Sequence, residues 1–183
     1  NRQCEVPTVR GLLSQGSDRL ARAALERPSH EASLLLAAAA GLTKEGLYSL
    51  YSNELDPAVT ERYEHYLSER CTGTPVAYIL GHKEFYGRDF LTDPRALIPR
   101  AETELLVDRA LDLARRLLAD NRDQPEEASP SKKDNSMGEA PLAIHDCCTG
   151  TGCVAISVAA ELVDEGYENV EVTGSDISGP AIE

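Results

Sequence analysis

One acid and two glycines that follow an apolar run have the spacing of a site for a nucleotide-like ligand. The run at 142–144 is followed by Asp146 and then by Gly150 and Gly152, and an apolar helical pattern begins at Cys153. Strand, glycine loop and helix in this order place a ligand across the end of the first strand of an α/β fold, because only glycine lets the backbone come so close or adopt a positive φ. The order Asp-x-x-x-Gly-x-Gly differs from the dinucleotide pattern Gly-x-Gly-x-x-Gly. It therefore indicates a cofactor without a pyrophosphate, such as S-adenosylmethionine.

A second acid stands at the end of the next expected strand. Residues 169–177 are rich in strand-forming residues and include Asp176 near their end, at about 20 residues beyond the glycine loop, where an acid would grip a ribose. A carboxylate suits that task because it accepts two hydroxyl hydrogen bonds at once. The alternative is an ordinary strand-to-helix turn at Gly150 and Gly152, with Asp176 as a helix cap. The combined order of strand, loop, helix, strand and acid favours the ligand site.

The residues that precede this site predict a separate helical part. Apolar spacing and cap residues predict helices over 8–25, 29–40, 43–50 and 57–71. Thr43 and Ser29 are expected caps, and Asp56 with Pro57 is the strongest start signal. Gly41 is the expected end of the second helix. We expect this helical domain to occupy residues 1–74.

Between the two parts, residues 75–99 predict a linker that contains a β-hairpin with its turn near Gly87–Arg88. A helix over 101–119 follows. Its buried side is expected to carry Leu105, Leu106, Ala110, Leu111, Leu113 and Leu117. Residues 120–140 are rich in Asp, Glu, Ser, Lys and Pro, and they predict a disordered insert because so little apolar surface cannot offset the entropy of ordering.

The expected fold class is α/β: an N-terminal helical bundle, a β-hairpin linker and the start of a Rossmann-like domain over residues 100–183. Strands at 142–146 and 170–175 would be parallel, joined by a right-handed crossover helix at 153–163. Two strands are fewer than a stable parallel sheet needs, since such sheets have more strands and helices on both faces. We therefore expect the chain to be a part of a longer protein.

The acidic composition disfavours several classes of partner. The 183 residues carry a formal net charge of −13, which repels phosphate backbones and anionic membrane surfaces, so we expect no stable nucleic-acid binding and no membrane binding. The odd number of cysteines, without paired Cys-x-x-Cys spacing, indicates reduced thiols rather than disulfides or a metal site. We expect a cytoplasmic monomer, or an organellar one if an N-terminal targeting segment has been removed.

Four segments resemble the HemK/PrmC family of S-adenosylmethionine-dependent protein methyltransferases. They are GTPVAYILG at 73–81, KEFYG at 83–87, LIPRAETE at 97–104, and 146–152 together with Asp176. The resemblance implies S-adenosylmethionine as the cofactor, no metal, and methyl transfer to the side-chain amide nitrogen of a glutamine in a class 1 peptide chain release factor. It also implies that the helical domain recognises the substrate protein.

The same resemblance implies a set of cofactor-binding residues: Asp146, Cys148, Thr149, Gly150, Thr151, Gly152 and Asp176, with Arg100, Glu102 and Thr103 beside the pocket. An equally weighted alternative makes the last three a hairpin-to-helix junction held by an Arg–Glu pair and a Thr cap. Phe85 and Tyr86 are expected to pack in that junction rather than contact a ligand.

The chain departs from the family pattern at three places. Ala101 replaces a proline, and Cys148 replaces the first glycine of the cofactor loop. The catalytic Asn-Pro-Pro-Tyr of the family follows the fourth strand of the sheet and is absent from this chain, so no catalytic residue is assigned. The rival interpretations are a ribosomal-protein glutamine methyltransferase, a nucleic-acid adenine N-methyltransferase, and a non-catalytic helical binding module.

Overall fold

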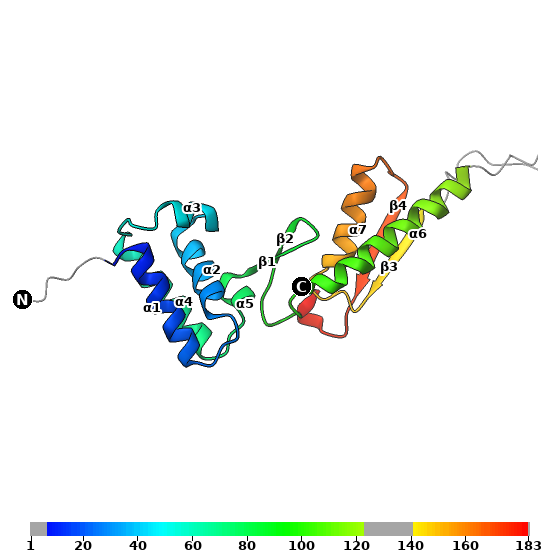
Figure 1. Ribbon diagram of the computed structural model, residues 1–183. Helices are drawn as coiled ribbons and strands as arrows, with labels where there is room; N and C mark the ends of the chain where they lie inside the picture. The colour runs from blue at the N-terminus through cyan, green and yellow to red at the C-terminus, as the bar shows by residue number, and fades with distance from the viewer. Residues whose placement is uncertain (1–6, 123–140, 183) are drawn as a thin grey trace, which may run out of the picture. The chain divides into compact units, whose positions relative to one another are not determined.

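The computed structural model describes residues 7–122 and 141–182 of the chain (Figure 1). The chain divides into two compact units between Gly81 and His82, and each unit is described by itself. The fold class is α/β, as predicted, with a helical first unit and a second unit in which helices accompany a parallel pair of strands. No helix in 7–122 or 141–182 has both the length and the apolar composition that crossing a bilayer requires.

Within residues 7–81, the first unit contains five helices: α1 (Val9–Arg22), α2 (Pro28–Ala40), α3 (Lys44–Ser49), α4 (Pro57–Cys71) and α5 (Val76–Leu80). Side-chain caps begin three of them. Thr8 Oγ1 accepts from Gly11 N at 3.3 Å, Thr43 Oγ1 from Gly46 N at 3.1 Å, and Asp56 Oδ1 from Ala58 N at 2.7 Å. Each cap satisfies a backbone N–H that has no partner inside the helix.

The start of α2 differs from the sequence prediction. Pro28 is its first residue, where the fixed φ of proline suits a helix and the missing N–H costs nothing. The Ser29 hydroxyl does not cap the helix but lies 2.8 Å from the Ser17 hydroxyl of α1. The predicted end of α2 is confirmed, because Gly41 adopts the left-handed conformation at φ 68°.

Side chains from α1 to α4 fill a single core. Its fully buried members include Leu12, Leu20, Leu35, Leu36, Leu47, Tyr63 and Leu67. Tyr63 can lie between α1 and α4 because Gly16 has no side chain: a Cβ added there would overlap the Tyr63 hydroxyl. Burial raises the pKa of the Tyr63 phenol, whose hydroxyl donates to Leu12 O at 3.5 Å.

The first unit extends past the expected domain limit at residue 74. Residues 76–80, expected in the linker, form helix α5, and Val76, Ile79 and Leu80 pack on the core of the first unit. Their i, i+3, i+4 spacing puts these three apolar side chains on one helical face. The hairpin that follows therefore starts at the unit boundary.

The hairpin of the second unit consists of β1 (His82–Phe85) and β2 (Arg88–Leu91), which pair antiparallel. Its turn residues are Tyr86 and Gly87, one position earlier than predicted, with φ values of 51° and 70°. Positive φ at both central residues is the two-residue turn whose twist matches the strands. Two hydrogen bonds hold Tyr86 in this unfavourable conformation: its N–H donates to Glu104 Oε1 at 3.1 Å and its hydroxyl to Asp108 Oδ1 at 2.8 Å.

After the hairpin come the short 3₁₀ turn η1 (Ala101–Thr103) and the long helix α6 (Glu104–Arg122). The helix continues three residues beyond the expected end at 119, so the predicted insert at 120–140 begins too early, and its remainder from 123 lies outside the described residues. The predicted buried side is correct only in part. Leu111 is buried, together with Val107 and Ala114, whereas the exposed side chains are Leu105, Leu106, Leu113 and Leu117. The core that α6 shares with the hairpin and α7 reaches only one side of the helix.

Among the described residues, the parallel sheet of the second unit consists of β3 (Leu142–Cys147) and β4 (Val170–Ser175), with α7 (Cys153–Asp164) between them in sequence. The 3₁₀ turn η2 (Gly179–Ala181) follows β4. The core of this unit includes Phe85 and Phe90 of the hairpin, whose rings meet edge to face with centroids 6.1 Å apart. Arg88 ties the hairpin to α7 through an ion pair with Glu161 at 2.7 Å. The hairpin is thus part of the second unit.

Candidate cofactor site

The loop between β3 and α7 has three residues in the left-handed region of φ. Gly150 and Gly152 have φ values of 55° and 75°, and Cys148 has φ 63°. Glycine adopts this conformation freely, whereas a residue with a Cβ loses about 1–2 kcal/mol there. Cys148 replaces the first glycine of the family's cofactor loop. A glycine there would therefore relieve the strain of the positive φ.

Hydrogen bonds tie this loop to β4 and to both predicted acids. Thr149 N donates to Ser175 O at 3.0 Å, and Thr149 Oγ1 donates to Asp146 Oδ2 at 2.8 Å. Gly150 N donates to Asp176 Oδ2 at 2.8 Å. The parallel register makes these bonds possible, because Cys147 pairs with Ser175 and the two strands end side by side. The structure thus brings together Asp146, Thr149, Gly150 and Asp176.

Asp176 bridges two backbone segments. Besides Gly150 N, its carboxylate accepts a hydrogen bond from Ser178 N at 2.9 Å. The N–H groups of Ser178 and Gly150 stabilise the charged form and lower the pKa of the carboxyl below its usual value. Each carboxylate oxygen has a second acceptor position, so the ionised Asp176 can hold the loop and still accept hydrogen bonds from a ligand.

Gly174 was not predicted as a site residue, although it makes the close approach of loop and strand possible. A Cβ built on Gly174 would lie 2.8 Å from Thr149 Oγ1 and 3.0 Å from Thr149 Cβ. The sequence carried a signal for it, since a glycine inside a strand pattern often marks the place where another backbone or a ligand comes close.

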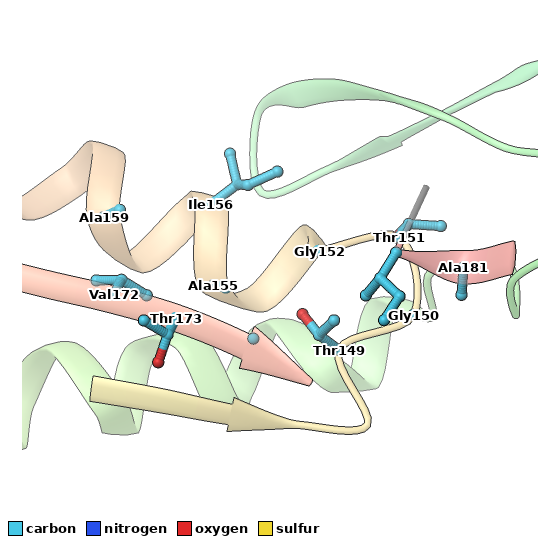
Figure 2. A pocket seen from close by; sticks show the side chains of 12 residues that line it. Thr149, Gly150, Thr151, Gly152, Ala155, Ile156, Ala159, Val172, Thr173 and Ala181 are labelled. Carbon is cyan, nitrogen blue, oxygen red and sulfur yellow. The ribbon is translucent and has the colours of Figure 1, made fainter. Parts of the chain in front are cut away.

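A pocket of about 430 Å³ lies beside the loop (Figure 2). Thr149, Gly150, Thr151 and Gly152 line one part of it. The rest of its wall comes from α7, β4, η2 and the residue after η2, and it is largely apolar: Ala155, Ile156, Ala159, Val172, Thr173, Gly174, Ala181 and Ile182. This volume is in the range of small-molecule sites, and an apolar wall with a few convergent polar groups is their usual composition.

The other predicted site residues lie outside the lining of this pocket. Asp146, Cys148 and Asp176 belong to the loop and the strand ends around it. Arg100 and Glu102 are exposed residues at η1, and Thr103 N donates to Arg100 O at 2.9 Å. Glu104, the next residue, links this segment to the hairpin by accepting a hydrogen bond from Tyr86 N. Phe85 is buried in the core of the second unit.

The cysteines among the described residues are all free: Cys71, Cys147, Cys148 and Cys153. Burial raises the pKa of the Cys153 thiol at the start of α7. Within 7–122 and 141–182, no three His, Cys, Asp or Glu side chains are grouped so that they could hold a metal ion. The site therefore consists of backbone N–H groups, hydroxyls and two carboxylates.

A helical unit followed by an α/β unit, whose glycine loop lies between two acids, defines the class of Rossmann-like methyltransferase folds. Comparison with known proteins gives the same class. Residues 11–81 match the family model described as the PrmC N-terminal domain. The chain is 34% identical over 181 residues to a bifunctional methyltransferase of Rickettsia felis, a match that covers 96% of this chain and 33% of that protein.

Two further relatives are named release factor glutamine methyltransferase. The one from Koribacter versatilis is 32% identical over 176 residues, covering 96% of this chain and 53% of the relative. The one from Moorella thermoacetica is 34% identical over 175 residues, covering 96% and 52%. The chain thus spans a third to about a half of the length of the curated relatives it matches. It belongs to the HemK/PrmC family.

Proposed function

We propose that this chain forms the cofactor-binding part of an S-adenosylmethionine-dependent methyltransferase that modifies a glutamine of a class 1 peptide chain release factor. The observation that carries the proposal is the hydrogen-bonded network of Asp146, Thr149, Gly150 and Asp176 at the ends of two parallel strands. Such strand ends are where open α/β sheets bind nucleotide-like ligands. The hydrogen bonds within this network hold the loop in one conformation, and a preorganised loop favours binding.

The residues present fit the cofactor. Nothing lies within 4 Å of where a Cβ of Gly150 would stand, so a ligand can approach the loop backbone closely. The N-terminus of α7 follows Gly152 and favours a carboxylate such as that of the methionine part. Asp176 would accept from the ribose hydroxyls, and Ile156 and Val172 would contact the flat apolar faces of the adenine. Arg100, Glu102 and Thr103 are proposed neighbours of the same pocket.

When bound, the cofactor supplies an electrophilic methyl group on a sulfonium that is already a good leaving group. The acceptor, a glutamine amide nitrogen, is a weak nucleophile because its lone pair is delocalised into the carbonyl. This part of the protein would contribute by holding the methyl donor in one orientation, which is the effect of proximity. The release factor as partner rests on the names of the relatives, and we propose the helical unit as its recognition surface.

The test of the cofactor site is Asp176→Ala, with S-adenosylhomocysteine binding measured by titration calorimetry. Loss of the carboxylate would remove the proposed ribose contact and the hydrogen bonds from Gly150 N and Ser178 N. We expect binding to weaken about tenfold or more.

Glu171→Ala is the matched control, since Glu171 is an exposed acid in β4, the strand that Asp176 follows; its binding should equal that of the wild type. Asp176→Asn keeps one acceptor oxygen and should fall between the two. Equal binding by the wild type and a folded Asp176→Ala variant would refute the site. Methyl transfer by the full-length protein to a release factor, and not to a ribosomal protein or DNA, would establish the acceptor.

A further inference from the structure

The chain makes a tight turn at residues 93–96, just after the hairpin. The sequence of this turn is Asp-Pro-Arg-Ala, and aspartate and proline are favoured at the first two positions of a type I turn. Ala96 N donates a hydrogen bond to Asp93 O at 3.3 Å and closes the turn. The residue before it, Thr92, is buried, so the turn starts from an anchored position. We call residues 93–96 the hairpin-exit turn.

The Asp93 carboxylate holds this turn in one conformation. It accepts hydrogen bonds from Arg95 N at 2.9 Å, from Arg95 Nε at 3.0 Å to each of its oxygens, and from Arg95 Nη2 at 2.7 Å. The bond to the backbone N–H is that of an Asx-turn, and the guanidinium adds a two-pronged contact. The Arg95 guanidinium and its backbone N–H lower the pKa of the Asp93 carboxyl, so these bonds persist at neutral pH. The position of the Arg95 carbonyl is thereby fixed.

Ser178 connects the hairpin-exit turn to the candidate cofactor site. Its Oγ donates to Arg95 O at 3.4 Å, although the two residues are 83 positions apart in the sequence. Its backbone N donates to Asp176 Oδ1 at 2.9 Å. The Ser178 side chain does not cap η2. One residue thus contacts the turn through its side chain and the proposed ribose acid through its backbone.

The turn also lies beside the cofactor loop and η2. A hollow of about 170 Å³ has Arg95 and Ala96 of the turn in one part of its wall, and Thr151 and Ala181 in another. Thr151 and Ala181 also line the larger pocket shown in Figure 2. The residues of the turn are not part of the wall of that larger pocket, so their effect on a ligand there is indirect.

We propose that Ser178 and the hairpin-exit turn are positioning residues for Asp176. The turn holds the Ser178 hydroxyl, and the Ser178 N–H then holds Asp176 Oδ1, while Gly150 N holds Oδ2. A carboxylate bonded at both oxygens presents its remaining acceptor positions in one orientation, and a ligand does not have to order it on binding. The inference rests on the proposed function in one respect, which is that the ribose hydroxyls are the ligand of Asp176.

The first readout needs no ligand. It is the pKa of the Asp176 carboxyl, measured by carbon-13 NMR titration of the full-length protein, with Asp176→Asn to assign the signal. The Ser178 N–H, followed by the Gly150 N–H, lowers this pKa. Ser178→Ala and Asp93→Ala should therefore raise it towards its ordinary value, because each releases Ser178 from the turn. Ser178→Thr keeps the hydroxyl and should keep the wild-type pKa.

The second readout is the binding of S-adenosylhomocysteine to the same proteins by titration calorimetry. Ser178→Ala should bind about two- to tenfold more weakly, which corresponds to one hydrogen bond. Asp93→Ala should weaken binding by a smaller factor, and Ser178→Thr should restore it. In the Asp176→Ala background, Ser178→Ala should have no further effect, since it acts through that carboxylate.

Asp89→Ala is the matched control for Asp93→Ala. Asp89 is also an exposed acid with a neighbouring partner, but its carboxylate lies 2.9 Å from His82 Nδ1 within the hairpin. This variant should have the wild-type affinity and the wild-type pKa of Asp176. Circular dichroism should show that all the variants keep the helical content of the wild type.

The two readouts separate a failure of this inference from a failure of the proposed function. A wild-type pKa of Asp176 in both Ser178→Ala and Asp93→Ala would overturn the positioning role. The same conclusion would follow if Ser178→Thr did not restore the pKa, or if Ser178→Ala weakened binding equally with and without the Asp176 carboxylate. A raised pKa with unchanged binding would support the positioning role and refute the ribose contact.

Discussion

The two units of the chain use leucine in opposite ways. In the helical unit, leucines on four helices meet in one core, and Leu12, Leu35, Leu36 and Leu67 are at most 1% exposed. In the α/β unit, one helix carries the buried Leu111 and the exposed Leu113 two positions apart. The first unit closes its core with its own helices. In the second unit, the described residues leave part of an apolar helix face and one strand edge uncovered.

The difference shows that having an apolar helix face and having a neighbour that covers it are two separate properties. Apolar spacing shows that a helix has a face suited to burial, but it does not show which neighbour covers that face. In the helical unit the neighbours lie within residues 9–80. In the α/β unit, α7 and the hairpin cover only the side of α6 that carries Val107, Leu111 and Ala114. The closed unit should therefore respond to substitution as a complete domain, and the open unit unevenly.

The largest expected effect contrasts Leu111→Ala with Leu113→Ala. Leu111 fills the core of the α/β unit, so its truncation should lower the free energy of unfolding by about 2–5 kcal/mol. Leu113 is exposed, and its truncation should change that energy by less than about 0.5 kcal/mol. Amide exchange of α6 and α7 as a function of urea concentration measures both. Equal losses for the two variants would mean that α6 packs through both sides in this chain.

A smaller effect, expected in the closed unit, tests the contact between Gly16 and Tyr63. Alanine favours helices over glycine, but Gly16→Ala should lower the free energy of unfolding by about 1–3 kcal/mol, because its methyl group overlaps the Tyr63 hydroxyl. Gly11→Ala on the same helix has only an ordinary contact, 3.6 Å from Thr8 Oγ1, and should raise it by up to about 1 kcal/mol.

Removing the Tyr63 hydroxyl tests whether its overlap with the added methyl group causes the loss of stability. Tyr63→Phe added to Gly16→Ala should restore part of the lost stability, because the phenol oxygen is the atom nearest the added Cβ. Chemical denaturation followed by circular dichroism at the helical signal gives the four values of the cycle. A Gly16→Ala variant as stable as Gly11→Ala would show that α1 and α4 can move apart at no cost.

The smallest effect is a gain of stability in the cofactor loop. Cys148→Gly should raise the free energy of unfolding of the α/β unit by roughly 1 kcal/mol or less, because glycine removes the cost of a positive φ but adds entropy to the unfolded chain. Cys147→Gly, one residue earlier in β3, should lower it, since glycine weakens strands. Thermal unfolding of the two variants compares them. A less stable Cys148→Gly variant would indicate that the thiol makes contacts that offset the strain.

Local chemistry made the helix ends of the closed unit predictable. Thr43 and Asp56 begin helices in the structure as they do in the sequence prediction, and Gly41 ends one. Such caps depend on residues within a few positions of one another. Residues 76–80 were placed in the wrong part of the chain because their helix is defined by packing on a core formed mostly by earlier residues.

At the candidate site, the elements could be predicted but their contacts could not. The strand, glycine loop, helix and second strand occur where the sequence indicated them. The bond from Gly150 N to Asp176, and the closeness of Thr149 to Gly174, depend on the register of two strands that are separated by a helix. No pattern of neighbouring residues in the sequence predicts the register between these two strands. The roles of Arg100, Glu102 and Thr103 remain a prediction for the same reason.

The closed core of the helical unit has a consequence for synthesis on the ribosome. Every member of that core precedes His82, so the unit can fold as soon as its residues have left the exit tunnel. At about 5–20 residues per second, the remaining 102 residues up to Glu183 take roughly 5–20 s to be added. Small helical domains fold in about microseconds to milliseconds. The nascent chain should therefore carry a finished helical unit while the strands of the sheet are still being made.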